Sequence, residues 1–189
     1  MPTGQKFEGF WDFSVRTYRT AGVPEACLSL QNDYGADVNM LLFCCWTGAV
    51  IGRFDAELFA KASEFSTEWA DHVVVPLRSA RTWMKRSGCD MEPVPTDTCM
   101  QVREEIKSVE FAAEKMQQQG LESLVSIDRS RTDAPDRVLE DVAANLTLYC
   151  EYAGLEVCED VRRSFVSVVS AALPDHDEQS ISSVLGLRT

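Results

Sequence analysis

Apolar residues recur along the chain at intervals of three and four, the spacing that places side chains on one face of an α-helix. The pattern predicts helices over about residues 10–20, 24–35, 38–51, 55–86, 97–119, 138–154 and 157–172, with Pro76 as a kink or a new helix start in the fourth. No stretch of useful length alternates between apolar and polar residues, as a half-buried β-strand would. The sequence therefore predicts an all-α fold, an orthogonal or bundle-like packing of about six to seven helices.

One of these segments, 38–51, is apolar on nearly every side. A helix that is apolar all round is a buried one, so we expect this helix at the centre of the fold. Asp37 precedes it and Asp55 precedes the next apolar segment, and aspartate is a preferred N-cap residue. Both are predicted to begin helices.

The segment 88–96 contains Gly88, Pro93 and Pro95 and has little periodicity, so we interpret it as a linker. The prediction is a single helical domain over 1–174, with sub-halves 1–87 and 97–174 left open as a subdivision. A polar loop is expected near 126–135. Residues 175–189 are expected to form a flexible or marginally helical tail.

The segment 97–119 has a regular apolar seam that suits packing against another helix. Its members are spaced by three and four and are Cys99, Val102, Ile106, Val109, Ala113 and Met116. We expect this seam to be buried and Gly120 to end the helix.

The chain has a formal net charge of −12, and its second half is the more acidic one. Residues 1–94 carry 9 basic and 12 acidic side chains, whereas residues 95–189 carry 9 basic and 18 acidic ones. A surface of this sign repels nucleic acid and anionic lipid, so neither is expected as a partner. A basic protein would be attracted to it.

The seven cysteines do not include a C-x-x-C pair of the kind that zinc or redox motifs use. Most lie within apolar periodic segments, where a thiol behaves as a small hydrophobic group. We expect reduced core cysteines and hence a reducing compartment. The N-terminus lacks the pattern of a signal peptide, and the stretch Met40 to Ile51 is too short to span a bilayer, so a cytoplasmic location is expected.

The sequence offers little for catalysis. It contains only two histidines, His72 and His176, and lacks a glycine-rich phosphate loop, a G-x-S-x-G or H-E-x-x-H motif and paired metal-binding aspartates. His176 lies in an acidic run that is interpreted as a solvated linker. We therefore expect no catalytic residues, no metal ligands and no cofactor.

Polar residues at the entrance to the apolar helix are the first candidate site. Gln31, Asp37 and Asn39 lie where buried polar groups must find hydrogen-bond partners. They either fasten the turn, with Asp37 as the N-cap, or face a pocket. Both interpretations stay open.

A basic stripe is the second candidate site. Arg78, Arg81 and Lys85 are spaced by three and four, which places them on one helix face. They could bind a carboxylate or phosphate, or pair with Asp37 across the core. The alternative is a solvated helix end that is favoured by the helix dipole.

Two motifs resemble a known family. The first is Phe10-Trp11-Asp12-Phe13-Ser14, Ala26-Cys27-Leu28-Ser29-Leu30-Gln31 and Asp37-Val38-Asn39-Met40-Leu41-Leu42-Phe43-Cys44, followed by Trp46 and Gly48. The second is Pro76-Leu77-Arg78 with Arg81. Together they resemble a proteobacterial family of conserved hypothetical proteins that is catalogued as a domain of unknown function, over roughly residues 8 to 120.

The resemblance implies a small cytoplasmic bacterial protein and no particular activity. It draws attention to the candidates Gln31, Asp37, Asn39, Arg78 and Arg81. Trp46 also lies in the first motif and is either a ligand-binding candidate or, like the other tryptophans, a core residue.

Two functions remain at this stage. The favoured one is a non-enzymatic protein-binding or adaptor module whose acidic second half meets a basic protein. The alternative is a binder or enzyme for an anionic small molecule, with a pocket formed by Gln31, Asp37 and Asn39 facing Arg78 and Arg81. A homo-oligomer is left open.

Overall fold

The computed structural model describes residues 8–90, 92–125 and 137–186, and these fold into helices joined by short turns. The predicted all-α class is confirmed. The helices are α1 (Phe10–Tyr18), α2 (Val23–Tyr34), α3 (Val38–Val50), α4 (Ala56–Trp69), the π-helical turn η1 (Ala70–Val74), α5 (Val75–Arg86), α6 (Thr96–Ser123), α7 (Val138–Ala153), α8 (Glu159–Ala172) and α9 (Glu178–Val184). Within this part of the chain, no helix has the length and apolar character needed to cross a membrane.

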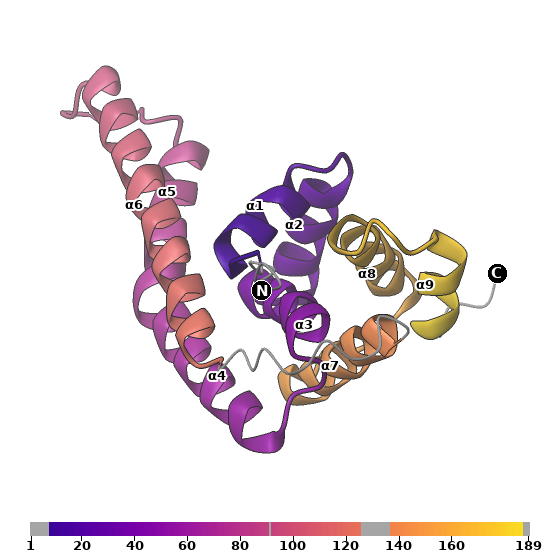
Figure 1. Cartoon of the computed structure of the whole chain (residues 1–189). Helices are drawn as coiled ribbons and strands as arrows, with labels where there is room; N and C mark the ends of the chain where they lie inside the picture. The colour runs from indigo at the N-terminus through magenta and orange to yellow at the C-terminus, as the bar shows by residue number, and fades with distance from the viewer. Residues whose placement is uncertain (1–7, 91, 126–136, 187–189) are drawn as a thin grey trace, which may run out of the picture.

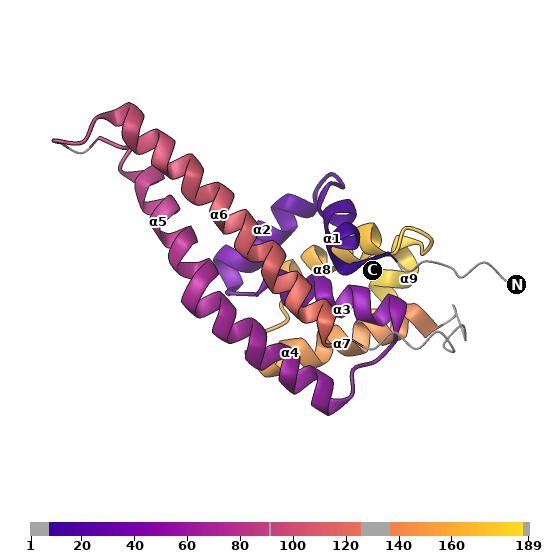
Figure 2. The same cartoon turned by 60° about the vertical axis from the view of Figure 1, so that its left-hand side comes forward.

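The molecule consists of a body and a long helical arm (Figures 1 and 2). The body is formed by α1, α2, α3, α7, α8 and α9. In the arm, α4, η1 and α5 run on as one rod, and α6 returns along its side. The end of the arm that holds α4 packs on α3, whereas the end that holds the α5–α6 turn projects away from the body.

The α3 helix lies at the centre, as its composition predicts. Every residue from Met40 to Gly48 is buried, and α3 contacts helices of both the body and the arm. Asp37 caps its first turn, because the Asp37 carboxylate accepts hydrogen bonds from the backbone N–H groups of Asn39 and Met40. Asp55 caps α4 in the same way through Leu58.

Close packing fixes α7 against α3. A Cβ atom added at Gly48 would lie 2.8 Å from both the backbone nitrogen and the Cα of Val142, so only glycine allows this approach. Beside it, the buried side chain of Asn145 donates to the carbonyls of Cys44 and Gly52. These bonds tie α7 to α3 and to the turn that follows α3.

The predicted seam of α6 is wrong in half of its positions. Cys99 and Ala113 are buried, but Val102, Val109 and Met116 are 38%, 54% and 56% exposed. The packed face of α6 contains polar residues instead, namely Glu110, Gln117 and Gln118. Apolar spacing alone could not reveal this, because those polar side chains are buried through partners on other helices.

Gly120 was expected to end α6 but lies inside it. A Cβ atom at this position would lie 2.3 Å from the ring of Phe65, so the glycine allows α6 to approach α4 closely. The helix continues to Ser123.

The segment 88–96 includes the turn between α5 and α6 at the free end of the arm. There Cys89 and Cys99 form a disulfide with a Cα–Cα distance of 5.5 Å. The expectation of reduced core cysteines is therefore wrong for Cys99, which is bonded to a cysteine ten positions away and not at the C-x-x-C spacing. Cys27, Cys44, Cys45 and Cys150 are free and buried, as core thiols should be.

The C-terminal segment contains the short helix α9, which Asp177 caps. Its Ile181 is fully buried against the body. The predicted loop at 126–135 and the last three residues of the tail lie outside the described residues.

Candidate functional site

A cleft of about 1150 Å³ lies between the arm and the body. Its body side is formed by residues of α1, α2, the start of α3 and the end of α7. Its arm side is formed by α4, η1, α5 and α6.

Asp37 lies at the floor of this cleft and has all its carboxylate oxygens in hydrogen bonds. One oxygen accepts the two backbone N–H groups of the cap, and the other accepts the hydroxyl of Ser66 at 2.7 Å and Nε2 of Gln117 at 3.1 Å. Burial raises the pKa of Asp37, although these hydrogen bonds and the charge of Arg78 oppose the rise. Asp37 thus caps the turn and also lines the cleft. The two interpretations of the sequence, a residue that fastens the turn and a residue that faces a pocket, therefore both describe its position.

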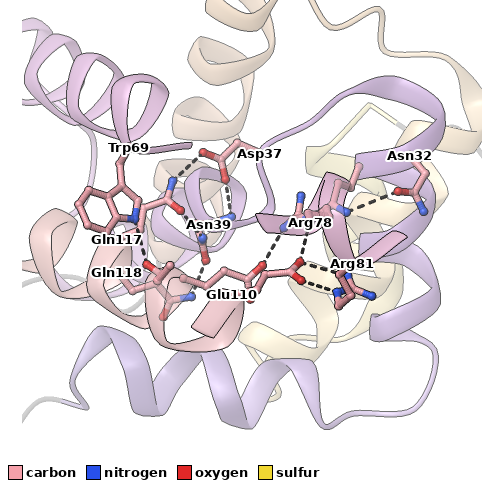
Figure 3. A network of polar contacts seen from close by, with 12 residues as sticks. Asn32, Asp37, Asn39, Trp69, Arg78, Arg81, Glu110, Gln117 and Gln118 are labelled. Carbon is pink, nitrogen blue, oxygen red and sulfur yellow. Dashed lines mark hydrogen bonds and ion pairs between the residues drawn. The ribbon is translucent and has the colours of Figure 1, made fainter. Parts of the chain in front are cut away.

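A chain of side-chain amides leads away from Asp37 (Figure 3). Asn39 Nδ2 donates to Oε1 of Gln117 at 2.7 Å, and Nε2 of Gln118 donates to Oδ1 of Asn39 at 2.8 Å. The chain thus crosses from α3 to α6 and joins the body to the arm.

The two arginines of the basic stripe are bound to glutamates of α6. Nε of Arg78 donates to Glu110 at 3.1 Å and its NH2 donates to Glu114 at 2.7 Å, while Arg81 binds both oxygens of Glu110 (Figure 3). The Arg78 and Arg81 side chains are 26% and 24% exposed and that of Glu110 is 7% exposed. The solvated-helix interpretation therefore does not fit Arg78 and Arg81, and their ion-pair partners are Glu110 and Glu114 rather than Asp37.

The two glutamates differ in their pKa shifts. Burial raises the pKa of Glu110, but the hydrogen bonds and charges of Arg81 and Arg78 outweigh it, so the net pKa is lowered. Burial raises the pKa of Glu114, and its single arginine partner does not reverse the rise. The quartet of two arginines and two glutamates is close to neutral as a whole.

The seven candidates from the sequence lie in different places. Gln31, Asp37, Asn39, Arg78 and Arg81 all line the cleft. Trp46 is fully buried in the core, where its indole N–H donates to the carbonyl of Glu8. Lys85 lies on an exposed part of α5, apart from the residues that line the cleft.

Three buried polar atoms at the cleft have no hydrogen-bond partner among the described residues. They are the hydroxyl oxygens of Ser14 and Ser63 and the amide oxygen Oε1 of Gln118. Each of these side chains is at least 96% buried. A buried polar atom without a partner costs about 1–3 kcal/mol, so three of them at one cleft call for an explanation.

The sides of the cleft are apolar and open to solvent. Five large side chains that are exposed to solvent line the cleft, namely Tyr18, Leu28, Val75, Phe111 and Tyr152. Trp11 of α1 meets the ring of Phe111 from α6 edge-on, with the ring centroids 5.3 Å apart. The cleft thus combines a polar floor with apolar sides.

Sequence reasoning missed Glu110, Glu114, Gln117 and Gln118. Their spacing of three and four along α6 was the available signal, since it places them on one helix face beside Ala113. The apolar residues of α6 have the same spacing and predict a different buried face, so the sequence favours the apolar face over the polar one. Ser14 and Ser63 gave no signal in the sequence.

This fold and this cleft define an all-α protein with a cleft between a helical arm and a helical body. Residues 9–121 match the family described as protein of unknown function (DUF2390), and the chain belongs to this family. The matched region contains α1 to α5 and most of α6, and so it contributes most of the residues that line the cleft. No curated protein and no solved structure matches the chain.

Proposed function

We propose that this protein binds a small organic molecule in the cleft between the arm and the body. The observation that carries the proposal is the set of unpartnered buried atoms on Ser14, Ser63 and Gln118, which all border the same cleft. Ligand sites are typically apolar concavities of about 300–1000 Å³ with a few convergent polar groups. This cleft has the same character and is somewhat larger, at about 1150 Å³. A bound molecule would supply the missing hydrogen bonds and cover the exposed apolar sides.

The test is native mass spectrometry of the protein isolated gently from its own host. We expect a stoichiometric small mass on the protein, and we expect Leu28→Glu, which places a charge on the cleft side, to remove it. Val109→Glu is the matched control, because Val109 is about as exposed as Leu28 but lies on the outer face of α6. The absence of any retained small mass, or its loss from both variants alike, would contradict the proposal.

A second candidate is the protein-binding module that the charge distribution favours. Its specific support is the outer face of α6, where Val102, Val109 and Met116 are exposed at seven-residue intervals in the acidic half of the chain. An unpartnered apolar stripe of this kind is typical of helix-mediated contacts.

Leu28→Glu and Val109→Glu also test this candidate, with Val109→Glu now as the disruptive variant and Leu28→Glu as the control. A partner protein that docks on the stripe should copurify with Leu28→Glu, dissociate as salt is raised and be lost from Val109→Glu. Loss of the partner from Leu28→Glu instead would place it at the cleft.

A further inference from the structure

The amide chain at the cleft floor has a fixed direction. The ionised carboxylate of Asp37 can only accept hydrogen bonds, and the same is true of the backbone carbonyl of Ser66. Gln117 faces both of them, at 3.1 Å from Asp37 and 3.4 Å from Ser66, and must therefore present its donor Nε2 to them. Its acceptor Oε1 then faces Asn39.

The same reasoning fixes the next two side chains. Asn39 must use Nδ2 toward Gln117, which leaves Oδ1 to accept from Nε2 of Gln118. Gln118 is then left with its acceptor, Oε1, and this is the atom that has no partner among the described residues. The chain that begins at Asp37 thus ends in a hydrogen-bond acceptor on Gln118, a residue that lines the cleft.

The arginines that line the cleft are already paired with glutamates, so they offer little unpaired positive charge to an anionic ligand. Arg81 is held on both oxygens of Glu110, and Arg78 is shared between Glu110 and Glu114. An anion at these arginines would have to displace a glutamate that is already hydrogen-bonded at 2.7 Å. A fully charged ligand would also lose its hydration against apolar sides such as Tyr18 and Phe111.

We infer that the cleft recognises an uncharged, mainly apolar molecule through an N–H or O–H donor that meets Oε1 of Gln118. This inference rests on the proposed ligand-binding role of the cleft and adds the charge and the hydrogen-bonding polarity of the ligand. The apolar part of the molecule lies against the open sides of the cleft.

Three fluorescent probes with one skeleton separate these properties. N-phenyl-1-naphthylamine is uncharged and has one N–H donor, its N-methyl derivative lacks the donor, and 8-anilinonaphthalene-1-sulfonate keeps the N–H and adds an anion. We expect the first probe to bind at one site per chain. The N-methyl derivative should bind at least about tenfold more weakly because it cannot make the hydrogen bond, and the sulfonate should bind at least about tenfold more weakly because its charge loses hydration in the cleft. Dissociation constants from fluorescence titration of the full chain give these ratios.

Two variants test the named atom. Gln118→Met keeps the length of the side chain but removes the acceptor, and it should bring the first two probes to within about twofold of each other. Gln119→Met is the control, because Gln119 is exposed on the same helix, and it should keep the difference. If Gln118→Met does not fold, the ratio of the first two probes on the unmodified protein still decides.

The outcomes separate the inference from the proposed function. Equal binding of the first two probes would overturn the donor requirement, and tightest binding of the sulfonate would overturn the uncharged class, while either result would leave a ligand-binding cleft. Binding of none of the three would overturn the inference, and the native mass spectrum would then decide the proposed function independently. Glu114→Gln, which frees part of Arg78, should improve binding of the sulfonate alone.

Discussion

Asp37 performs two tasks with one side chain. It caps α3 through two backbone N–H groups, and it orients Gln117 through its second oxygen. The cap was predictable, because an aspartate before an apolar helix is a local pattern. The second task was not, because Ser66 and Gln117 come from helices 29 and 80 residues away along the chain.

Replacement of Asp37 by alanine should therefore cost more than the loss of a cap. Loss of an N-cap costs about 1 kcal/mol. The hydroxyl of Ser66 and Nε2 of Gln117 also lose an acceptor, and a buried polar group without its partner costs about 1–3 kcal/mol more. We expect the free energy of unfolding to fall by about 3 kcal/mol, measured by urea denaturation.

The matched control is Asp55→Ala, since Asp55 caps α4 through one backbone N–H and its side chain is exposed. It should cost about 1 kcal/mol. Equal losses in the two variants would mean that the contacts of Asp37 with Ser66 and Gln117 contribute nothing to stability.

Glu114 should give the stability a measurable pH dependence. Burial raises its pKa above the ordinary value of 4.5, so the folded protein holds the proton more tightly than the unfolded chain does. Protonation of Glu114 therefore stabilises the folded protein. This stabilisation is present in full below the pKa that Glu114 has in the unfolded chain, and it is lost as pH rises through the higher pKa that Glu114 has in the folded protein.

A glutamine at this position cannot ionise and lacks this dependence. The difference in free energy of unfolding, native protein minus Glu114→Gln, should therefore decrease as pH rises from about 4 to about 7. Urea denaturation at several pH values gives the difference, and an increase over this range would contradict the sign of the pKa shift.

At the scale of helices, the sequence predicted best where burial follows apolarity. The central helix α3 is apolar on all sides and is buried on all sides, so its place in the fold could be predicted. For α6 the same rule chose the wrong face, because Glu110, Gln117 and Gln118 are buried through hydrogen bonds with Arg78, Arg81, Asp37 and Asn39. Those partners lie on helices whose positions relative to α6 are a property of the tertiary structure.

The joint between α5 and α6 should depend on Glu110 more than on any exposed carboxylate of α6. Glu110→Gln leaves Arg81 without its carboxylate and removes one of the two partners of Arg78. Breaking a buried ion pair costs about 3–5 kcal/mol, and the partial exposure of these arginines lowers the expected loss to about 2 kcal/mol.

Chemical denaturation of Glu110→Gln beside Glu105→Gln measures this loss. Glu105 is exposed on α6, and its replacement should change stability little. A similar small effect in both variants would show that the ion pairs do not hold the arm together.

At the scale of the molecule, the arm packs on the body at the end that holds α4 and projects away from it at the end that holds the α5–α6 turn (Figure 1). The cleft lies between these two parts. The alternative hypothesis from the sequence placed five of the lining residues around a pocket. The sequence could not show the size or shape of that space, since the angle between arm and body follows from contacts of α6 with α1 and α3 and of α4 with α3. Close approaches at Gly48 within the body and at Gly120 within the arm set the packing inside each part, and the sequence does not show what lies against a glycine in a helix.

The disulfide Cys89–Cys99 should stabilise the free end of the arm. It closes a loop across a sequence separation of 10, for which chain-entropy arguments give roughly 3 kcal/mol. We expect Cys89→Ser to speed amide hydrogen exchange in the last turn of α5 and the first turns of α6, with little change in the body.

A reductant provides the control. In dithiothreitol the native protein should approach the exchange rates of the variant, whereas the variant itself should not respond. Identical exchange in the native protein with and without reductant would show that the bond does not stabilise this end.

The π-helical turn Ala70–Val74 sets the rotation of α5 about the axis that it shares with α4. A π turn accommodates one more residue than an α turn, and one residue corresponds to about 100° of rotation around a helix. Removing a single residue here, such as the exposed His72, would let the rod continue as a plain α-helix and would rotate Arg78 and Arg81 away from Glu110. The rod can thus be regarded as two helices that share one axis but differ in their rotation about it, and deletion of one residue between them would change which side chains of α5 face the cleft.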